Sequence, residues 1–215
     1  MHVLLWQVFT SIRILFFTQT HINSSNMPLD SNVVTKLRGI VDGACADQTA
    51  GIPGTSVVVV SRSGEELFAH AAGKRGVASQ EPMTLDNVFW IASCTKMLTG
   101  VAVMQLVEQG LLKLDDGEQT EKIVPELKEL KVLNKDGKLE DKKRAITLRM
   151  LLTHTSGCAY TFFNERLRDW TLPAGFDEFS GRLEDIKMPL VFQPGEGWEY
   201  GVSGPCMNRS HCIKY

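Results

Sequence analysis

The sequence predicts an α+β fold, in which a short antiparallel sheet accompanies a mainly helical region. A β-branched run over 55–61 precedes a Ser63-Gly64 turn and a second strand over 66–72, a pattern typical of a hairpin. A helical pattern with apolar positions from Val33 to Ala44 lies before it, where Asp30 or Ser31 can cap the helix, and another pattern follows over 94–109. Because two strands alone are marginally stable in water, we expect the hairpin to belong to an incomplete antiparallel sheet that faces a helical subdomain.

The composition of the 215-residue chain is that of a globular protein, with 43% hydrophobic and 22% charged residues. A net charge of −2 indicates no preference for nucleic acid or for an anionic membrane. The five cysteines include no C-x-x-C pair, and their odd, scattered placement favours reduced thiols. We therefore expect no metal, no cofactor, no nucleic-acid partner, no firm membrane partner and a cytoplasmic location, while the oligomeric state stays open.

The two ends of the chain differ from its middle. Residues 1–26 are apolar, but Arg13 interrupts the run, no positive segment precedes it and no small-residue cleavage site follows. We interpret them as an N-terminal extension that does not pack into the core, with secretion or membrane anchoring as the alternative. The globular part is expected over 27–203, and residues 204–215 are expected to form an irregular tail.

The helical pattern over 94–109 carries one apolar stripe. Met97, Val101, Met104 and Val107 recur at helical spacing, which indicates the apolar face of the helix. Gly110 follows the last of them and is predicted to end the helix as its C′ residue.

Ser93 and Lys96 lie near the start of this helix. Two side chains three residues apart share a helix face, so the amine can lie beside the hydroxyl. The apolar flanks predict a poorly solvated amine with a lowered pKa, and a neutral amine can take the proton of a serine nucleophile. The alternative to a catalytic pair is a helix start at which Ser93 or Thr95 is the capping residue and Lys96 is solvated. Ser-x-x-Lys also occurs by chance, so the motif alone is a hypothesis.

Two further side chains stand in turn-rich segments. Thr147 is predicted to cap a helix over 148–152, and His154 follows the end of that helix. His154 could act as a catalytic base. We favour a structural role, because the ring N–H of a histidine at a helix end often donates a hydrogen bond to a backbone carbonyl. Tyr200 ends a turn-rich stretch, and loop tips often carry functional groups. Its alternative is an amphipathic rim residue.

Four segments in one order carry a resemblance to a known family. They are the hairpin PGTSVVVVSRSGEELFAHAAGKRG, then FWIASCTKMLTG, ITLRMLLTHTSG and FQPGEGWEYGVS. Over about 28–203 the chain resembles the serine β-lactamase and penicillin-binding-protein family, most of all its branch of class C-like esterases and fungal acyltransferases. The resemblance implies a β-lactamase/transpeptidase-like fold.

The resemblance also implies roles for three residues. Ser93 matches the acylated nucleophile, whose backbone N–H is one oxyanion donor. Lys96 matches the residue that activates it. Tyr200 matches the tyrosine that relays the proton, and a cationic neighbour is needed to lower its pKa from near 10. The implied activity is that of a hydrolase or acyltransferase, which moves an acyl group from a small-molecule ester or thioester through the serine.

The sequence departs from the family pattern in two places. Val202 stands where the lactamase Tyr-x-Asn motif has asparagine, which favours ester or thioester chemistry. The family's third motif, whose strand supplies a second oxyanion donor worth about 3–4 kcal/mol, has no match. The alternatives are therefore a truncated, catalytically inactive relative and a binding remnant, and we expect at most weak turnover of esters or lactams.

Overall fold

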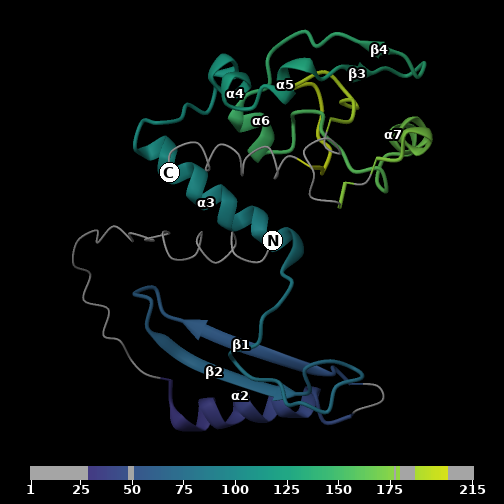
Figure 1. Ribbon diagram of the computed structural model, residues 1–215. Coiled ribbons are helices and arrows are strands. Elements are labelled where there is room, and N and C mark those ends of the chain that lie inside the picture. The colour runs from purple at the N-terminus through teal and green to yellow at the C-terminus, as the bar shows by residue number, and fades with distance from the viewer. Residues whose placement is uncertain (1–28, 48–50, 177, 180–186, 203–215) are drawn as a thin grey trace. The chain divides into compact units, whose positions relative to one another are not determined.

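A computed structural model describes residues 29–47, 51–176, 178–179 and 187–202 (Figure 1). The predicted extension over 1–26 and tail over 204–215 lie outside the described residues. The described chain divides into two compact units at the Trp90–Ile91 junction. Within the described residues, no helix is both long and apolar enough to cross a membrane.

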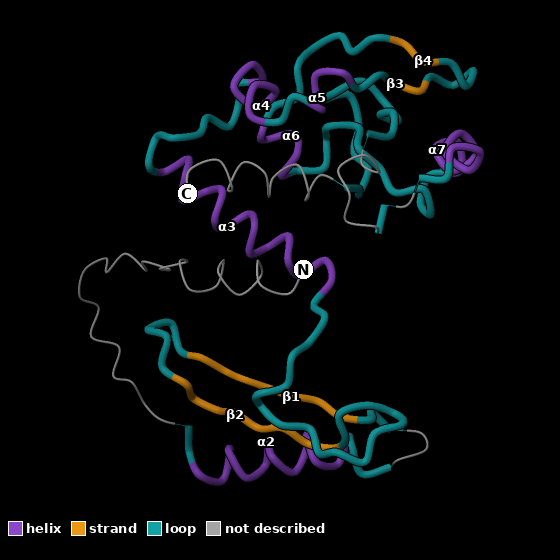
Figure 2. Tube along the Cα trace, in the orientation of Figure 1, coloured by secondary structure: helices purple, strands orange, loops and turns teal. Residues whose placement is uncertain are grey.

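The first unit is a helix beside a hairpin (Figures 1 and 2). Helix α2 spans Ser31–Ala44 and begins where the Asp30 carboxylate accepts the N–H of Asn32 at 2.7 Å. Strands β1, Gly54–Val60, and β2, Glu66–Gly73, pair antiparallel. The helix and the hairpin predicted from the sequence are therefore confirmed.

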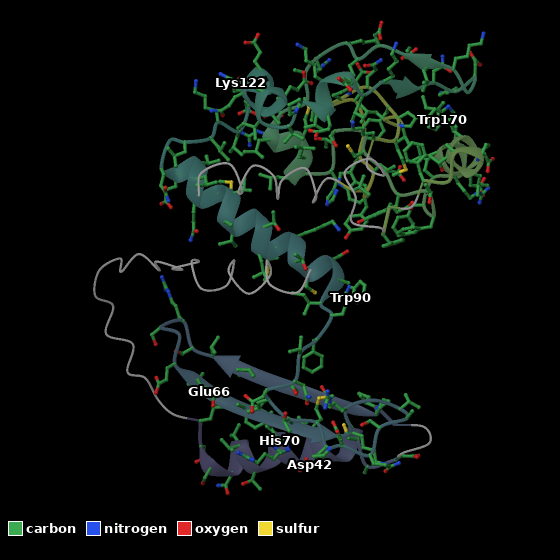
Figure 3. All side chains as sticks on the ribbon, viewed as in Figure 1. Asp42, Glu66, His70, Trp90, Lys122 and Trp170 are labelled. Carbon is green, nitrogen blue, oxygen red and sulfur yellow. The ribbon has the colours of Figure 1, made fainter. Side chains whose placement is uncertain are left out.

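A small contact surface joins helix and hairpin in this unit. Phe68 and Ala72 of β2 are buried, as is Cys45 just after the helix. Asp42 accepts a hydrogen bond from His70 Nε2 at 2.7 Å, so a polar pair ties α2 to β2 (Figure 3). No residue within α2 is fully buried, so the helix covers the sheet only in part.

The second unit begins with the predicted long helix. A 3₁₀ turn, η1, spans Ala92–Cys94 and leads into α3, which spans Thr95–Glu108. Gly110 has φ +72°, and its N–H donates to the carbonyl of Val107 at 2.9 Å. A glycine in the left-handed region after the last turn is the expected C′ residue, as the sequence predicts.

Of the apolar stripe predicted for α3, three residues are exposed and the fourth, Val107, is partly buried against the core. Met97, Val101 and Met104 are 69%, 48% and 42% exposed, whereas Ala102 and Val103 are buried. The helix carries apolar side chains on nearly every face, so their spacing does not select the one that packs.

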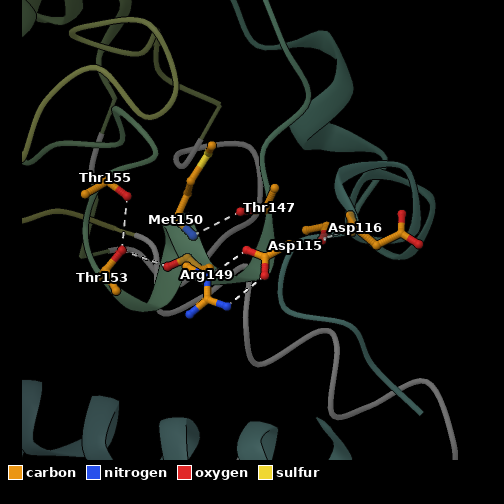
Figure 4. Close-up of polar contacts among 8 residues, drawn as sticks. Asp115, Asp116, Thr147, Arg149, Met150, Thr153 and Thr155 are labelled. Atoms are coloured by element: carbon orange, nitrogen blue, oxygen red, sulfur yellow. Dashed lines mark hydrogen bonds and ion pairs between the residues drawn. The ribbon is translucent and has the colours of Figure 1, made fainter. Parts of the chain in front are cut away.

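The rest of the second unit consists of short elements joined by long loops (Figure 2). They are α4 Gly117–Ile123, α5 Glu126–Glu129, β3 Val132–Leu133, β4 Leu139–Glu140, α6 Leu148–Leu152, α7 Glu165–Thr171 and η2 Leu172–Ala174. Strands β3 and β4 form a short antiparallel hairpin, in which β3 is buried and belongs to the core. The Thr147 hydroxyl caps α6 by accepting the N–H of Met150, as predicted (Figure 4).

One hydrophobic core holds these short elements together. Its members come from α3, from the helices α4 to α7 and from the segment before the Tyr200 loop. The fully buried ones include Val103, Val124, Leu127, Ile146, Leu151, Leu167 and Leu190. The core includes residues of two segments, 154–160 and 191–202, which carry Tyr160 and Tyr200.

Candidate active site

Ser93 and Lys96 meet at the start of α3. The Lys96 amine donates a hydrogen bond to Ser93 Oγ at 3.1 Å. Ser93 lies within the 3₁₀ turn, directly after Ala92, which has φ +43°. A non-glycine residue with positive φ is uncommon, and such strain gathers at functional sites. Ser93 is exposed and Lys96 is half-buried, so the hydroxyl is accessible while the amine is partly shielded.

Two phenol rings flank the same amine. Lys96 Nζ donates to the hydroxyl of Tyr160 at 3.2 Å and lies 4.8 Å from the ring centroid of Tyr200. The two tyrosine rings are 5.7 Å apart and tilted by 47°. The structure therefore brings together all three residues singled out from the sequence, Ser93, Lys96 and Tyr200, and adds Tyr160 to them.

Backbone hydrogen bonds fix the loop that carries Tyr200. They join segment 191–199 to segment 154–157 through Val191 N to Gly157 O at 2.8 Å, Gly195 N to Thr155 O at 2.8 Å and Glu199 N to His154 O at 3.0 Å. Beyond Tyr200, a Cβ on Gly201 would lie 2.2 Å from the carbonyl oxygen of Cys158. Only glycine permits this approach, which holds Tyr200 close to the segment that carries Tyr160.

His154 contacts the loop that carries Tyr200. Its backbone has φ +59°, its ring centroid is 4.7 Å from that of Tyr200, and its Nδ1 lies 3.5 Å from the Gly201 N–H as an acceptor. Burial, and then the charge of Lys96, lower the pKa of His154, so the ring is neutral near pH 7. The structural role favoured from the sequence fits this position. The ring, however, accepts a hydrogen bond from the Gly201 N–H, whereas the sequence predicts that it donates one to a carbonyl.

The turn around His154 is anchored at the end of α6. Thr153 Oγ1 donates to the carbonyl of Arg149 at 2.8 Å and also bonds to Thr155 Oγ1 at 3.0 Å (Figure 4). The Arg149 guanidinium forms two 2.7 Å bonds to the Asp115 carboxylate. This polar network fixes the turn that precedes His154.

The electrostatics of the site differ from the sequence prediction at Lys96. Burial lowers the pKa of Lys96, but hydrogen bonds to Tyr200 and Tyr160 outweigh it, so the pKa is raised above its ordinary 10.5. The predicted lowering of the lysine pKa is therefore wrong, because two phenol oxygens stabilise the ammonium. Hydrogen bonds from Ser93 and then from Lys96 lower the pKa of Tyr200. The site thus combines a cation with a phenol that ionises more readily.

Tyr160 is the residue of the cluster that the sequence analysis missed. It lies three residues after Gly157 in LLTHTSGCAY, and no local pattern distinguishes it from a core aromatic. Only the tertiary approach of this segment to α3, 64 residues earlier, places its hydroxyl on the amine. Among the residues that the structure describes, no group of three or more His, Cys, Asp or Glu side chains could hold a metal ion.

Comparison with known proteins identifies a matching family model and several relatives. A family model described as Beta-lactamase matches residues 38–204. The chain is 39% identical over 166 residues to a lovastatin esterase of Penicillium rubens, covering 73% of this chain and 41% of that protein. It is 38% identical over 160 residues to the acyltransferase calJ of Penicillium decumbens, covering 69% of this chain and 38% of that protein. The chain thus spans about two fifths of the length of the curated relatives it matches.

Solved structures extend the comparison to the fold. Unliganded simvastatin synthase (LovD) from Aspergillus terreus matches with a TM-score of 0.69 and 28% identity, covering 86% of this chain and 50% of that chain. EstCE1, a hydrolase with promiscuous acyltransferase activity, matches with a TM-score of 0.62 and 25% identity, covering 83% and 46%.

Proposed function

Because this chain belongs to the beta-lactamase family, we propose that it transfers acyl groups from a small-molecule ester or thioester through Ser93, to water or to an alcohol. The observation that carries the proposal is the convergence of Ser93 Oγ, the Lys96 amine and two tyrosines from distant segments. The names of its relatives, a lovastatin esterase and an acyltransferase, support the same class of reaction.

In the acylation step, Tyr200 acts as the base. Its hydrogen bonds to Ser93 and Lys96 favour the phenolate form. The phenolate takes the Ser93 proton as Oγ forms a bond to the acyl carbonyl carbon. The backbone N–H of Ser93 donates to the developing oxyanion. As the tetrahedral intermediate collapses, the bond to the leaving oxygen or sulfur breaks, and Tyr200 returns the proton to the leaving group.

Deacylation reverses this order with a different nucleophile. Water or an alcohol gives its proton to Tyr200 and attacks the acyl carbon of the Ser93 ester. Ser93 Oγ then departs and recovers the proton from the phenol. Before the reaction begins, Lys96 is an ammonium, because hydrogen bonds to the two phenols raise its pKa. Its role is to hold the serine and both tyrosines and to favour the phenolate.

The test is covalent labelling of the full chain. Incubation with p-nitrophenyl butyrate or a fluorophosphonate should add one group per chain, which intact-mass spectrometry detects and peptide mapping places on Ser93. Ser93→Ala should remove the label, whereas Ser203→Ala, at a serine outside the described residues, should keep it. Labelling elsewhere, or none in a chain that unfolds cooperatively, would contradict the proposal.

A further inference from the structure

His154 contacts each of four successive residues in the loop that carries Tyr200. The centroid of its ring lies 6.2 Å from that of Trp198 and 4.7 Å from that of Tyr200. Its carbonyl accepts the Glu199 N–H at 3.0 Å, and its Nδ1 accepts the Gly201 N–H at 3.5 Å. One residue therefore holds the loop through both its ring and its backbone.

The backbone of His154 restricts which side chains this position allows. Its φ of +59° lies in the left-handed region, which most residues avoid and which histidine, asparagine and aspartate enter more readily. On either side, the hydroxyls of Thr153 and Thr155 are bonded to each other at 3.0 Å. The ring is therefore carried by a turn of fixed conformation, against which the loop can be positioned.

The hydrogen bond to Gly201 depends on the protonation state of the His154 ring. A neutral imidazole accepts at Nδ1 only when its proton is on Nε2, whereas an imidazolium donates from both nitrogens. Protonation would therefore place two donors, the ring Nδ1–H and the Gly201 N–H, against each other. Burial, and then the charge of Lys96, lower the pKa of His154, so the accepting form is present near pH 7.

The elements around this ring carry several other titratable groups. They are Lys96, Arg149, Tyr160, Glu196, Glu199 and Tyr200. The Arg149 guanidinium is paired with the Asp115 carboxylate, and Lys96 is the charge that acts on the His154 ring. Because the pKa of Lys96 is itself raised, this amine stays cationic over the whole range in which His154 gains its proton. The hydrogen bond to Gly201 is therefore controlled by the proton of His154 itself.

We propose that His154 is a positioning residue for Tyr200, and that it acts only while its neutral ring accepts the Gly201 N–H. With this bond made, the loop holds the Tyr200 phenol beside Ser93 and Lys96. When the ring gains a proton, the bond is lost and the phenol moves away from the serine. This inference rests on the proposed function for the role of Tyr200, but the coupling between ring and loop requires no acyl transfer.

The first experiment follows the loop by NMR of the isotope-labelled full chain, without any substrate. We expect the Gly201 amide proton and the His154 ring to titrate with one midpoint below 6.5, the ordinary pKa of histidine. In His154→Asn, the Gly201 signal should not titrate between about pH 5 and 8, because an amide oxygen accepts without changing its charge. His70→Asn, at a histidine of β2, is the matched control and should leave the Gly201 titration unchanged.

Two results of this titration would overturn the proposal. One is a Gly201 amide that does not titrate with the His154 ring, and the other is an amide that still titrates in His154→Asn. Asparagine suits the left-handed backbone of this position, and thermal melting of each variant verifies that it is folded. Because no ester is present, both results hold whether or not the chain transfers acyl groups.

The second experiment measures the consequence for catalysis with p-nitrophenyl butyrate. His154→Gly permits the left-handed backbone but removes the ring, and it should lower kcat/KM by about 10- to 100-fold, as expected for a displaced catalytic group. His154→Asn restores an acceptor, so its kcat/KM should stay within about threefold of the wild type. Equal losses in the two variants would overturn the proposal, because the acceptor would then not matter.

The pH profile of the same reaction separates positioning from a merely structural role. Below the pKa of His154, the logarithm of kcat/KM for the wild type should fall with a slope of about two, one proton each for Tyr200 and His154. In His154→Asn the slope should stay at about one. A slope that is the same in both chains would overturn the proposal. No turnover by the wild type would instead contradict the proposed function, and the NMR titration would then decide the coupling of ring and loop.

Discussion

At the scale of single residues, the candidate site depends on how one amine divides its hydrogen bonds. Lys96 donates to Ser93 Oγ and to the Tyr160 hydroxyl, and its amine lies 4.8 Å from the ring centroid of Tyr200. Each oxygen partner stabilises the ammonium, and the ammonium in turn stabilises the phenolate of Tyr200. A lysine with a raised pKa is a poor base, so we propose that the tyrosine is the proton acceptor of the pair.

The first prediction separates the two tyrosines. Tyr200→Phe should lower kcat/KM for p-nitrophenyl butyrate by about 10²- to 10⁴-fold, because the proton acceptor is removed. Tyr160→Phe keeps the aromatic ring and loses one hydrogen bond to Lys96, so kcat/KM should fall by about 10-fold or less. Steady-state kinetics on the full chain measure both. A larger fall in kcat/KM for Tyr160→Phe than for Tyr200→Phe would indicate that Tyr160 is the base.

The second prediction concerns pH. A phenolate base makes kcat/KM rise with pH through the pKa of Tyr200, which is lowered from 10, and an essential ammonium makes it fall above the raised pKa of Lys96. Lys96→Met should shift the rising limb upward, because the cation that favours the phenolate is lost. A pH–rate profile with an activated ester measures it. A rising limb that begins only above pH 10.5 would indicate neutral Lys96 as the base.

At the scale of elements, two short segments set the geometry. The turn η1 and the first turn of α3 place Ser93 beside Lys96, while the bonded segments 154–157 and 191–199 lead to Tyr200. None of these elements exceeds a few turns, so the positions of the phenols depend on backbone contacts between loops. The closest of these contacts is at Gly201.

The third prediction tests that contact. Gly201→Ala should destabilise the protein by about 1–3 kcal/mol, because the new Cβ would meet the Cys158 carbonyl. It should also raise the pKa of Tyr200 toward 10, since the loop must move away from Ser93 and Lys96. Urea unfolding and ultraviolet titration of the tyrosines measure the two effects.

The matched control is Gly39→Ala within α2, where a new Cβ meets nothing within 4 Å. It should stabilise the protein by about 0.5–1 kcal/mol, because alanine favours a helix interior over glycine. A Gly201→Ala chain as stable as the wild type, with an unchanged Tyr200 pKa, would show that the contact does not position the loop.

The elements that the sequence predicted well are those with local signals. The Asp30 and Thr147 caps, the turn-bounded hairpin and Gly110 each depend on neighbours within a few residues. The site was predicted only in part. A spacing of three residues reveals the Ser93–Lys96 pair, but the pKa of the lysine depends on phenols from segments far along the chain. Tyr160 was missed because its partner lies 64 residues away.

At the scale of the whole molecule, the described residues fold as two compact units with unequal cores. The unit that begins at Ile91 encloses most of the buried apolar side chains, whereas the buried ones among the described residues of the other unit are Cys45, Phe68 and Ala72. The sequence could not predict this division, because both units carry similar apolar patterns. We therefore expect substitutions at buried residues of α3 to lower the stability of the second unit more than substitutions at its exposed residues.

The last prediction compares neighbouring residues of α3. Val103 is fully buried in the core of the second unit, and Met104 is 42% exposed. Val103→Ala should lower the free energy of unfolding by about 1.5–3 kcal/mol, because two buried methyl groups worth about 0.8 kcal/mol each are lost and a cavity is left. Met104→Ala should change it by less than about 0.5 kcal/mol, as is usual for surface positions. Urea unfolding of the full chain, followed by circular dichroism, compares the two. Equal losses would mean that the Met104 face of the helix is covered in solution, and that α3 packs on both sides.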